Sequence, residues 1–508
     1  MPTEKFAWEE TAPHRWERDI DEVETFYTTL AKRFEGTGRT FFAMTCHVSI
    51  KVDVIDESVL TIERRVIEAL REAWVCLRYD HPLIASWVEY HHEAKRCRKV
   101  YEGLPKTNQH IHQSAWLNET FKIISNGQTG QEWCNSDPPV PKLPTLFLVK
   151  NGPCAEHGEF QADLILRAQH DVIDGIGSLH LMNNLFRHAA RAYGQPEKVP
   201  VHRFGDEWKN LSPPLRIAAD IPLTLTSEQE VRLKGIVRDN LFLREEIEVA
   251  TLPFRFGRTI PGRHQRLALE IPSQTTYLVL RACKELGASV THVYHAAIAV
   301  LMGELQECRP QRRVVRYINY SLINERHHCR EPFNTAQHAA SVYHSISGKS
   351  LAIDLTVTAI NDEPLDTEQT RQKMMDAIEQ VKEYYTSIRN DTEHITMVPS
   401  IWSLSTPAYP SGSEIPPVPA PNESPSASIS SLGVIDQIIS PKHGIFEIFD
   451  PWVTGEELGT GLGLFLATFN GRMGLSAAYN DAWHDKAEVM DFLTRCHGLV
   501  LTTLGVSS

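Results

Sequence analysis

A histidine and an aspartate four residues apart stand out in the segment 169–175, which has the sequence QHDVIDG. A neutral imidazole near pH 7 is an effective general base, so His170 could remove a proton from a reacting group. Asp174 falls where the chain turns, and Gly175 permits a backbone conformation that other residues avoid. On the pattern alone, a hydrogen-bonded core histidine followed by a helix-capping aspartate remains an alternative interpretation.

The residues on either side of this segment predict how His170 is held. Between Ala162 and Gln169, apolar residues alternate with other types, which is typical of a strand with a well-buried face. From Ser178 onward the apolar residues recur at steps of three and four, which predicts a helix. We therefore expect His170 to lie in a strand-to-helix connection, where its ring can project into a cleft.

Periodic segments along the rest of the chain predict a mixed α/β protein. Helical spacing is found in 56–77, 227–238, 273–286, 289–305, 366–387 and 485–504. Strand patterns are found in 146–149, 314–322, 462–469 and 473–479. Asn470-Gly471 separates the last two strands and predicts a type I′ hairpin, because both residues accept positive φ. Asp485 and Glu488 are spaced as a capping box for the final helix.

The periodic pattern weakens between about Gly194 and Gly262, which suggests a boundary. We therefore predict an N-terminal lobe over 1–200 that carries His170, a crossover linker over 201–262 and a C-terminal lobe over 263–508. The segment 399–425 is rich in proline and serine and is expected to be a surface excursion from the second lobe.

The motif HxxxDG between a strand and a helix, followed by a long second half, resembles the CoA-dependent acyltransferase superfamily. This superfamily includes chloramphenicol acetyltransferase, peptide-synthetase condensation domains and plant BAHD acyltransferases. In chain length, in its excess of acidic residues and in its detailed sequence pattern, the chain is most similar to the fungal trichothecene 15-O-acetyltransferases. The resemblance covers most of the chain. It implies two chloramphenicol-acetyltransferase-like lobes, each a mixed sheet covered by helices, with the active-site tunnel between them.

The resemblance also implies roles for particular residues. His170 matches the catalytic base of the superfamily, and Asp174 and Gly175 would support the site structurally. Arg326 resembles the arginine that pairs with the motif aspartate and turns that carboxylate away from the substrate. The segment Ser430-Ser431-Leu432-Gly433 resembles one that lines the cleft in relatives, which makes Ser430, Ser431 and Gly433 candidate cleft residues.

Two departures from the superfamily pattern are visible. Condensation domains have a histidine immediately before the catalytic one, whereas this chain has Gln169, which weakens that interpretation. The DFGWG block of BAHD proteins is missing, and the segments 450–452 and 459–463 occupy roughly its region.

Composition excludes several other classes of protein. The formal charge of −13 argues against a nucleic-acid or membrane-surface partner. Nine scattered cysteines without a CxxC pair suit reduced thiols, and the start lacks a signal-peptide pattern, so a cytoplasmic location is expected. The histidine pairs at 91/92, 110/112 and 327/328 lack an HExxH or cysteine-rich setting, so no metal is expected.

The resemblance implies an O-acetyltransferase that moves an acetyl group from acetyl-CoA to a hydroxyl of a secondary metabolite. The acceptor that it implies is the 15-hydroxyl of a trichothecene. Acetyl-CoA would be a co-substrate, and no tightly bound cofactor or carrier protein is expected. Three alternatives remain: a condensation-type domain acting on carrier-bound acyl groups, a non-catalytic ligand-binding descendant, and a hydrolase using His170.

Overall fold

Strands and helices are interspersed along the chain, and the strands form five sheets within the described residues. The structure is a computed structural model that describes residues 4–53, 58–105, 107–150, 159–195, 204–363, 366–412 and 415–506. The helices are α1 (Glu22–Phe34), α2 (Val59–Asp80), α3 (Gln109–Thr120), α4 (Gly130–Asn135), α5 (Gly175–Gly194), α6 (Leu215–Ala218), α7 (Ser227–Phe242), α8 (Ser273–Leu286), α9 (Val290–Glu304), α10 (Thr367–Arg389), α11 (His394–Ser405) and α12 (Lys486–Leu504).

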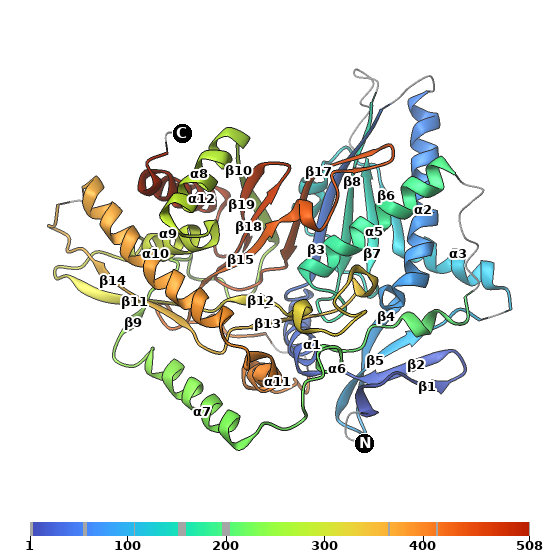
Figure 1. Cartoon of the computed structure of the whole chain (residues 1–508), viewed down its shortest axis with the longest axis horizontal. Coiled ribbons are helices and arrows are strands. Elements are labelled where there is room, and N and C mark those ends of the chain that lie inside the picture. The colour runs from blue at the N-terminus through green and yellow to red at the C-terminus, as the bar shows by residue number, and fades with distance from the viewer. Residues whose placement is uncertain are drawn as a thin grey trace.

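The N-terminal lobe is built around a six-stranded sheet. Its strands, in spatial order, are β16 (Lys442–His443), β17 (Phe446–Gly455), β3 (Met44–Asp53), β8 (Glu159–Ala168), β7 (Thr145–Lys150) and β6 (Phe121–Ile124). Helices α2 and α5 pack together and against this sheet (Figure 1), because each carries an apolar stripe at helical spacing. Their buried side chains share one hydrophobic core with those of β3 and β8.

The C-terminal lobe is built around a four-stranded sheet. Its strands, in spatial order, are β10 (His264–Ile271), β19 (Arg472–Asn480), β18 (Leu462–Phe469) and β15 (Ala427–Val434). Helices α8, α9, α10 and α12 gather on this side of the molecule (Figure 1) and share a second hydrophobic core with the sheet. No single helix in the described ranges is long and apolar enough to cross a membrane; α8 and α9 meet that test only as a pair, with a 93° bend between them.

Three smaller sheets complete the fold. One contains β1 (Glu9–Ala12), β2 (Arg15–Asp19), β5 (Arg96–Glu102) and β4 (Ser86–His91). Another contains β14 (Leu351–Val357), β11 (Arg313–Asn319) and β9 (Glu248–Val249). The third pairs β12 (Leu322–Asn324) with β13 (His344–Ile346).

Two strands from the C-terminal half of the chain, β16 and β17, belong to the N-terminal sheet. β17 comes from the C-terminal half of the chain but pairs antiparallel with β3 in the N-terminal sheet, with Val453 opposite Cys46. The chain then returns to the C-terminal sheet as β18. The covalent chain therefore crosses the gap between the lobes close to the end of β8, which places β17 beside the predicted site.

The predicted mixed α/β fold with two lobes is confirmed, and most predicted elements occur near their expected positions. Asn470 and Gly471 have φ values of 47° and 71° in the hairpin between β18 and β19. Asp485 and Glu488 form the expected capping box at the start of α12. The predicted start of the first long helix at residue 56 lies outside the described residues, and α2 is described from Val59.

Two segments differ from the expectations about boundaries. The segment expected to be a linker contains α7, which is longer than predicted and extends to Phe242. The proline-rich segment begins inside a helix, because α11 includes Pro399 and continues to Ser405. The domain boundaries at residues 200 and 262 stay predictions.

Candidate active site

His170 lies in the turn between β8 and α5, as the change of periodicity predicts. Its side chain contributes to the wall of a cavity of about 830 Å³. Residues of both lobes line this cavity, including segments of α1, α7, α11, β15 and β18. Much of the wall is apolar, with side chains such as Phe42, Leu233, Ile236, Ile323, Trp402 and Phe465. The imidazole therefore faces a largely apolar cavity that both lobes enclose.

The Asp174 carboxylate is hydrogen-bonded on several sides, and His170 Nδ1 is not among its partners. Its Oδ2 accepts hydrogen bonds from Arg326 Nη1 at 2.9 Å and from the Tyr343 backbone N–H at 2.8 Å. Its Oδ1 accepts a bond from the Gly177 N–H at 2.7 Å, which caps the N-terminus of α5. The predicted ion pair between Asp174 and Arg326 is confirmed, and the side chains are only 5% and 6% exposed.

The charges of this pair are mutually stabilised. Burial alone would raise the pKa of Asp174, but the Arg326 guanidinium and the neighbouring His344 hold it well below its usual range. The carboxylate is therefore ionised at neutral pH and already has its acceptor positions occupied. Asp174 is suited to fixing the turn and not to exchanging protons.

The glycine that this turn requires is Gly177, not Gly175. Gly175 is the first residue of α5 and is not among the glycines with positive φ, so the predicted need for an unusual backbone is wrong. A Cβ at Gly175 would meet Val453 Cγ2 at 3.3 Å, whereas one at Gly177 would lie 2.3 Å from the Ala339 carbonyl oxygen. It would also lie 2.8 Å from Arg326 Nη2. Gly177 therefore allows the Asp174–Arg326 pair to form.

Two aromatic side chains that the sequence did not indicate complete the surroundings of His170. Tyr27, from α1, stacks on the His170 ring with a centroid distance of 3.8 Å and an interplanar angle of 10°. His344, from β13, lies 5.4 Å from His170 between ring centroids. Both line the cavity. They are 143 and 174 residues away in sequence and belong to no local motif, so only the tertiary fold reveals them.

The environment keeps His170 neutral. Burial, with a smaller contribution from His344, lowers its pKa from 6.5 to about 3, although its own backbone and Asp174 act in the opposite direction. At pH 7 the ring therefore has a free nitrogen lone pair that can accept a proton. Its Nδ1 is buried without a hydrogen-bond partner.

The predicted cleft residues of β15 are partly brought to the cavity. Ser430 and Ser431 line the wall, and Ser431 is hydrogen-bonded to Thr291 at 2.8 Å between oxygens. Gly433 is not among the lining residues; it has a φ of 72° and follows a bulge in the pairing with β18. The segment 459–463 lines the cavity, whereas Trp452 is buried against His47 at 4.6 Å between ring centroids.

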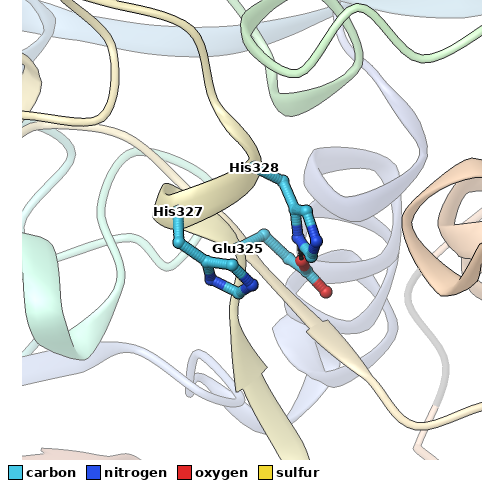
Figure 2. A group of neighbouring side chains, drawn as sticks. All are labelled: Glu325, His327 and His328. Carbon is cyan, nitrogen blue, oxygen red and sulfur yellow. Dashed lines mark hydrogen bonds and ion pairs between the residues drawn. The ribbon is translucent and has the colours of Figure 1, made fainter. Parts of the chain in front are cut away.

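Glu325, His327 and His328 form a cluster beside Arg326, and one nitrogen or oxygen from each lies within 4.8 Å of the others. In Figure 2 the Glu325 carboxylate lies next to the His328 imidazole, and the His327 imidazole lies to one side of them. Oε2 of Glu325 accepts a bond from His328 Nδ1 at 2.7 Å, and Oε1 accepts one from Ser345 Oγ. A metal ion would have to replace these donors, so hydrogen bonding of a buried carboxylate explains the arrangement.

Comparison with solved structures defines the class of fold. The first condensation domain of the CDA synthetase superposes with a TM-score of 0.57 at 15% identity, with 97% of each chain covered. The TRI3 trichothecene 15-O-acetyltransferase from Fusarium sporotrichioides superposes with a TM-score of 0.77 at 15% identity, with 98% of each chain covered. The protein therefore has the two-lobed fold of the condensation domains and of this acetyltransferase.

The family follows from the sequence comparison. The model of the family described as 15-O-acetyltransferase Tri3 matches residues 6–401, and the chain belongs to this family. Among curated relatives, acetyltransferase pigO of Monascus ruber is 22% identical over 98% of both chains. O-acetyltransferase pigM of the same organism is 24% identical over 94% of this chain and 84% of the relative. The protein is an enzyme of the O-acetyltransferase class, which confirms the resemblance stated from the sequence.

Proposed function

We propose that the protein transfers the acetyl group of acetyl-CoA to a hydroxyl group of a secondary metabolite, with His170 as general base. The observation that carries this proposal is the neutral imidazole of His170 on the wall of the cavity, next to an aspartate that is bound to Arg326. A base that is neutral at pH 7 can accept the alcohol proton, and the ion-paired Asp174 leaves this role to the histidine.

In the proposed reaction the acceptor oxygen attacks the carbonyl carbon of the acetyl thioester directly. His170 takes the hydroxyl proton as the new C–O bond forms. The C–S bond then breaks, and His170 returns the proton to the CoA thiolate. The apolar cavity favours this reaction because excluding water suppresses hydrolysis of the thioester.

Family membership supports a trichothecene with a free 15-hydroxyl as the first acceptor to test. A second candidate is an azaphilone-type alcohol, because an azaphilone biosynthesis cluster protein from Aspergillus terreus is 22% identical over 79% of this chain. The aromatic and aliphatic cavity wall suits an acceptor with a largely apolar skeleton. Free acetyl-CoA is the proposed donor, and no carrier protein takes part.

The test is mass spectrometry of each alcohol incubated with the purified protein and acetyl-CoA. A mass increase of one acetyl group on either acceptor, dependent on the protein and on His170, is the expected result. Release of free acetate without acetylated product would favour a hydrolase. Transfer only from an acyl group on a carrier protein would favour a condensation-type enzyme.

A further inference from the structure

Tyr27 and His344 pack beside the ring of His170, close to the Asp174–Arg326 pair. The Tyr27 ring lies nearly parallel to the His170 imidazole, and its hydroxyl is 2.7 Å from His344 Nε2. His344 Nδ1 in turn lies 3.8 Å from Asp174 Oδ2. His344 Nδ1 is buried without a hydrogen-bond partner, so this approach to Asp174 is not a hydrogen bond. Tyr27 is therefore the residue that joins the two histidines: it is hydrogen-bonded to His344 and stacked on the imidazole of His170.

A hydrogen bond between the Tyr27 hydroxyl and His344 Nε2 orients the tyrosine side chain. Burial raises the pKa of the Tyr27 hydroxyl well above its ordinary value, with Tyr320 and Asp174 adding to the shift. Tyr27 therefore keeps its proton, and a neutral phenol hydroxyl can donate a hydrogen bond to His344 Nε2 or accept one from it. In either direction, this hydrogen bond fixes where the Tyr27 hydroxyl points.

The plane of the Tyr27 ring is also held by its other neighbours. Phe26, Phe42 and Trp402 surround it with ring centroids 5.2, 6.0 and 6.0 Å away. The side chain is buried, and α1 packs against α11. Tyr27 therefore presents one rigid face to His170.

We infer that Tyr27, oriented by His344, is a positioning residue for His170: it holds the imidazole in the plane needed for proton transfer and stabilises the imidazolium that forms during the reaction. This inference rests on the proposed function, because it requires His170 to accept a proton. The face of an aromatic ring attracts a cation, so a stacked tyrosine stabilises the protonated imidazole more than the neutral one. The contact therefore acts mainly in the transition state and on kcat.

The experiment measures kcat and KM for both substrates in Tyr27→Leu, Tyr27→Phe and His344→Gln. Tyr277→Phe is the matched control, since that tyrosine is 63% exposed and lies on α8. Removing the stacked ring in Tyr27→Leu is expected to lower kcat roughly 10- to 30-fold, the range of a desolvated cation–π contact, with little change in KM. Tyr27→Phe and His344→Gln keep the aromatic ring at position 27 but remove the Tyr27–His344 hydrogen bond that orients it. Each is expected to lower kcat about two- to fivefold.

A double variant separates positioning from general packing. In a His170→Ala background, Tyr27→Leu is expected to cause no further loss of the residual rate, because its effect passes through the imidazole. Melting temperatures are measured alongside. If Tyr27→Leu does not fold, the kcat values of Tyr27→Phe and His344→Gln decide the matter.

The inference is overturned if the folded Tyr27 and His344 variants all keep the kcat of Tyr277→Phe, while His170→Ala is inactive. That outcome leaves the proposed function intact. If His170→Ala keeps the wild-type kcat, the proposed function fails, and the inference fails with it. An equal loss from Tyr27→Leu with and without His170 would make the tyrosine a general packing residue and would also overturn the inference.

Discussion

Arg326 Nη1 donates a hydrogen bond to Asp174 Oδ2 at 2.9 Å, and both side chains are buried. The pair joins two segments 152 residues apart, the turn that carries His170 and the 3₁₀ turn that follows β12. The same carboxylate caps α5 and accepts the Tyr343 N–H. One buried charge therefore fixes the position of the turn from which the imidazole projects.

Breaking this ion pair is expected to reduce both stability and activity. Asp174→Asn and Arg326→Gln each leave a buried charge without its partner, which costs about 3–5 kcal/mol of the free energy of unfolding. The double variant is expected to lose less than the sum of the two single losses, because both act on one interaction. Denaturant unfolding of the four proteins measures this coupling; strictly additive losses would show that the pair is not energetically coupled.

Gly177 and Gly175 offer a matched comparison within one helical turn. Gly177→Ala places a methyl group against the Ala339 carbonyl oxygen and the Arg326 guanidinium, so we expect a loss of roughly 1–3 kcal/mol in stability. Gly175→Ala meets only the side chain of Val453 at close range and is expected to be milder. Thermal unfolding of both variants tests the difference, and a greater loss in Gly175→Ala would contradict the geometry of the turn.

The low pKa of His170 predicts a distinctive dependence of activity on pH. An ordinary histidine becomes protonated below pH 6.5 and would then fail as a base, whereas burial and His344 lower the pKa of His170 to about 3. The acid limb of kcat/KM, which reports the free enzyme, is therefore expected well below pH 6.5. A half-loss of kcat/KM near pH 6.5, with the protein still folded at that pH, would contradict this environment.

The same pKa shift makes the free energy of unfolding depend on pH. Because the native pKa lies below the unfolded one, the unfolded chain binds more protons between about pH 3 and pH 6.5. Stability contributed by neutral His170 is therefore present above pH 6.5 and is lost as the pH falls towards 3. Measured by denaturant unfolding, His170→Ala is expected to lose less stability than the wild type over this interval; an equal loss would contradict the shift.

Direct transfer predicts that a ternary complex forms without an acetylated enzyme. Within the part of the chain that the structure describes, no serine or cysteine is hydrogen-bonded to the His170 ring, as an activated nucleophile would be. Initial-rate plots with both substrates varied are expected to intersect. Parallel lines together with an acetyl group on the protein in intact-mass spectra would contradict direct transfer.

Local sequence patterns predicted the parts of the site that one segment supplies. The strand, turn and helix around His170 follow from a change of periodicity from two to 3.6 residues. The Asp174–Arg326 pair was predicted because the resemblance carried a second, distant motif. The hairpin at Asn470-Gly471 followed from the positive φ that both residues accept.

Features that depend on distant segments could not be found in this way. Tyr27 and His344 reach His170 only because α1 and β13 meet at the cavity, and neither residue lies in a pattern with a chemical signature. The addition of β17 to the N-terminal sheet and the close approach at Gly177 likewise arise from packing between elements. The low pKa of His170 follows from the burial that this packing creates.

The most direct test of the account is the turnover of His170→Ala with acetyl-CoA and an accepted alcohol. We expect kcat to fall by roughly 10²- to 10⁴-fold, the usual contribution of a general base, while the affinity for CoA and the melting temperature change little. Wild-type turnover in a folded His170→Ala protein would contradict the central claim and return His170 to the role of a buried structural histidine.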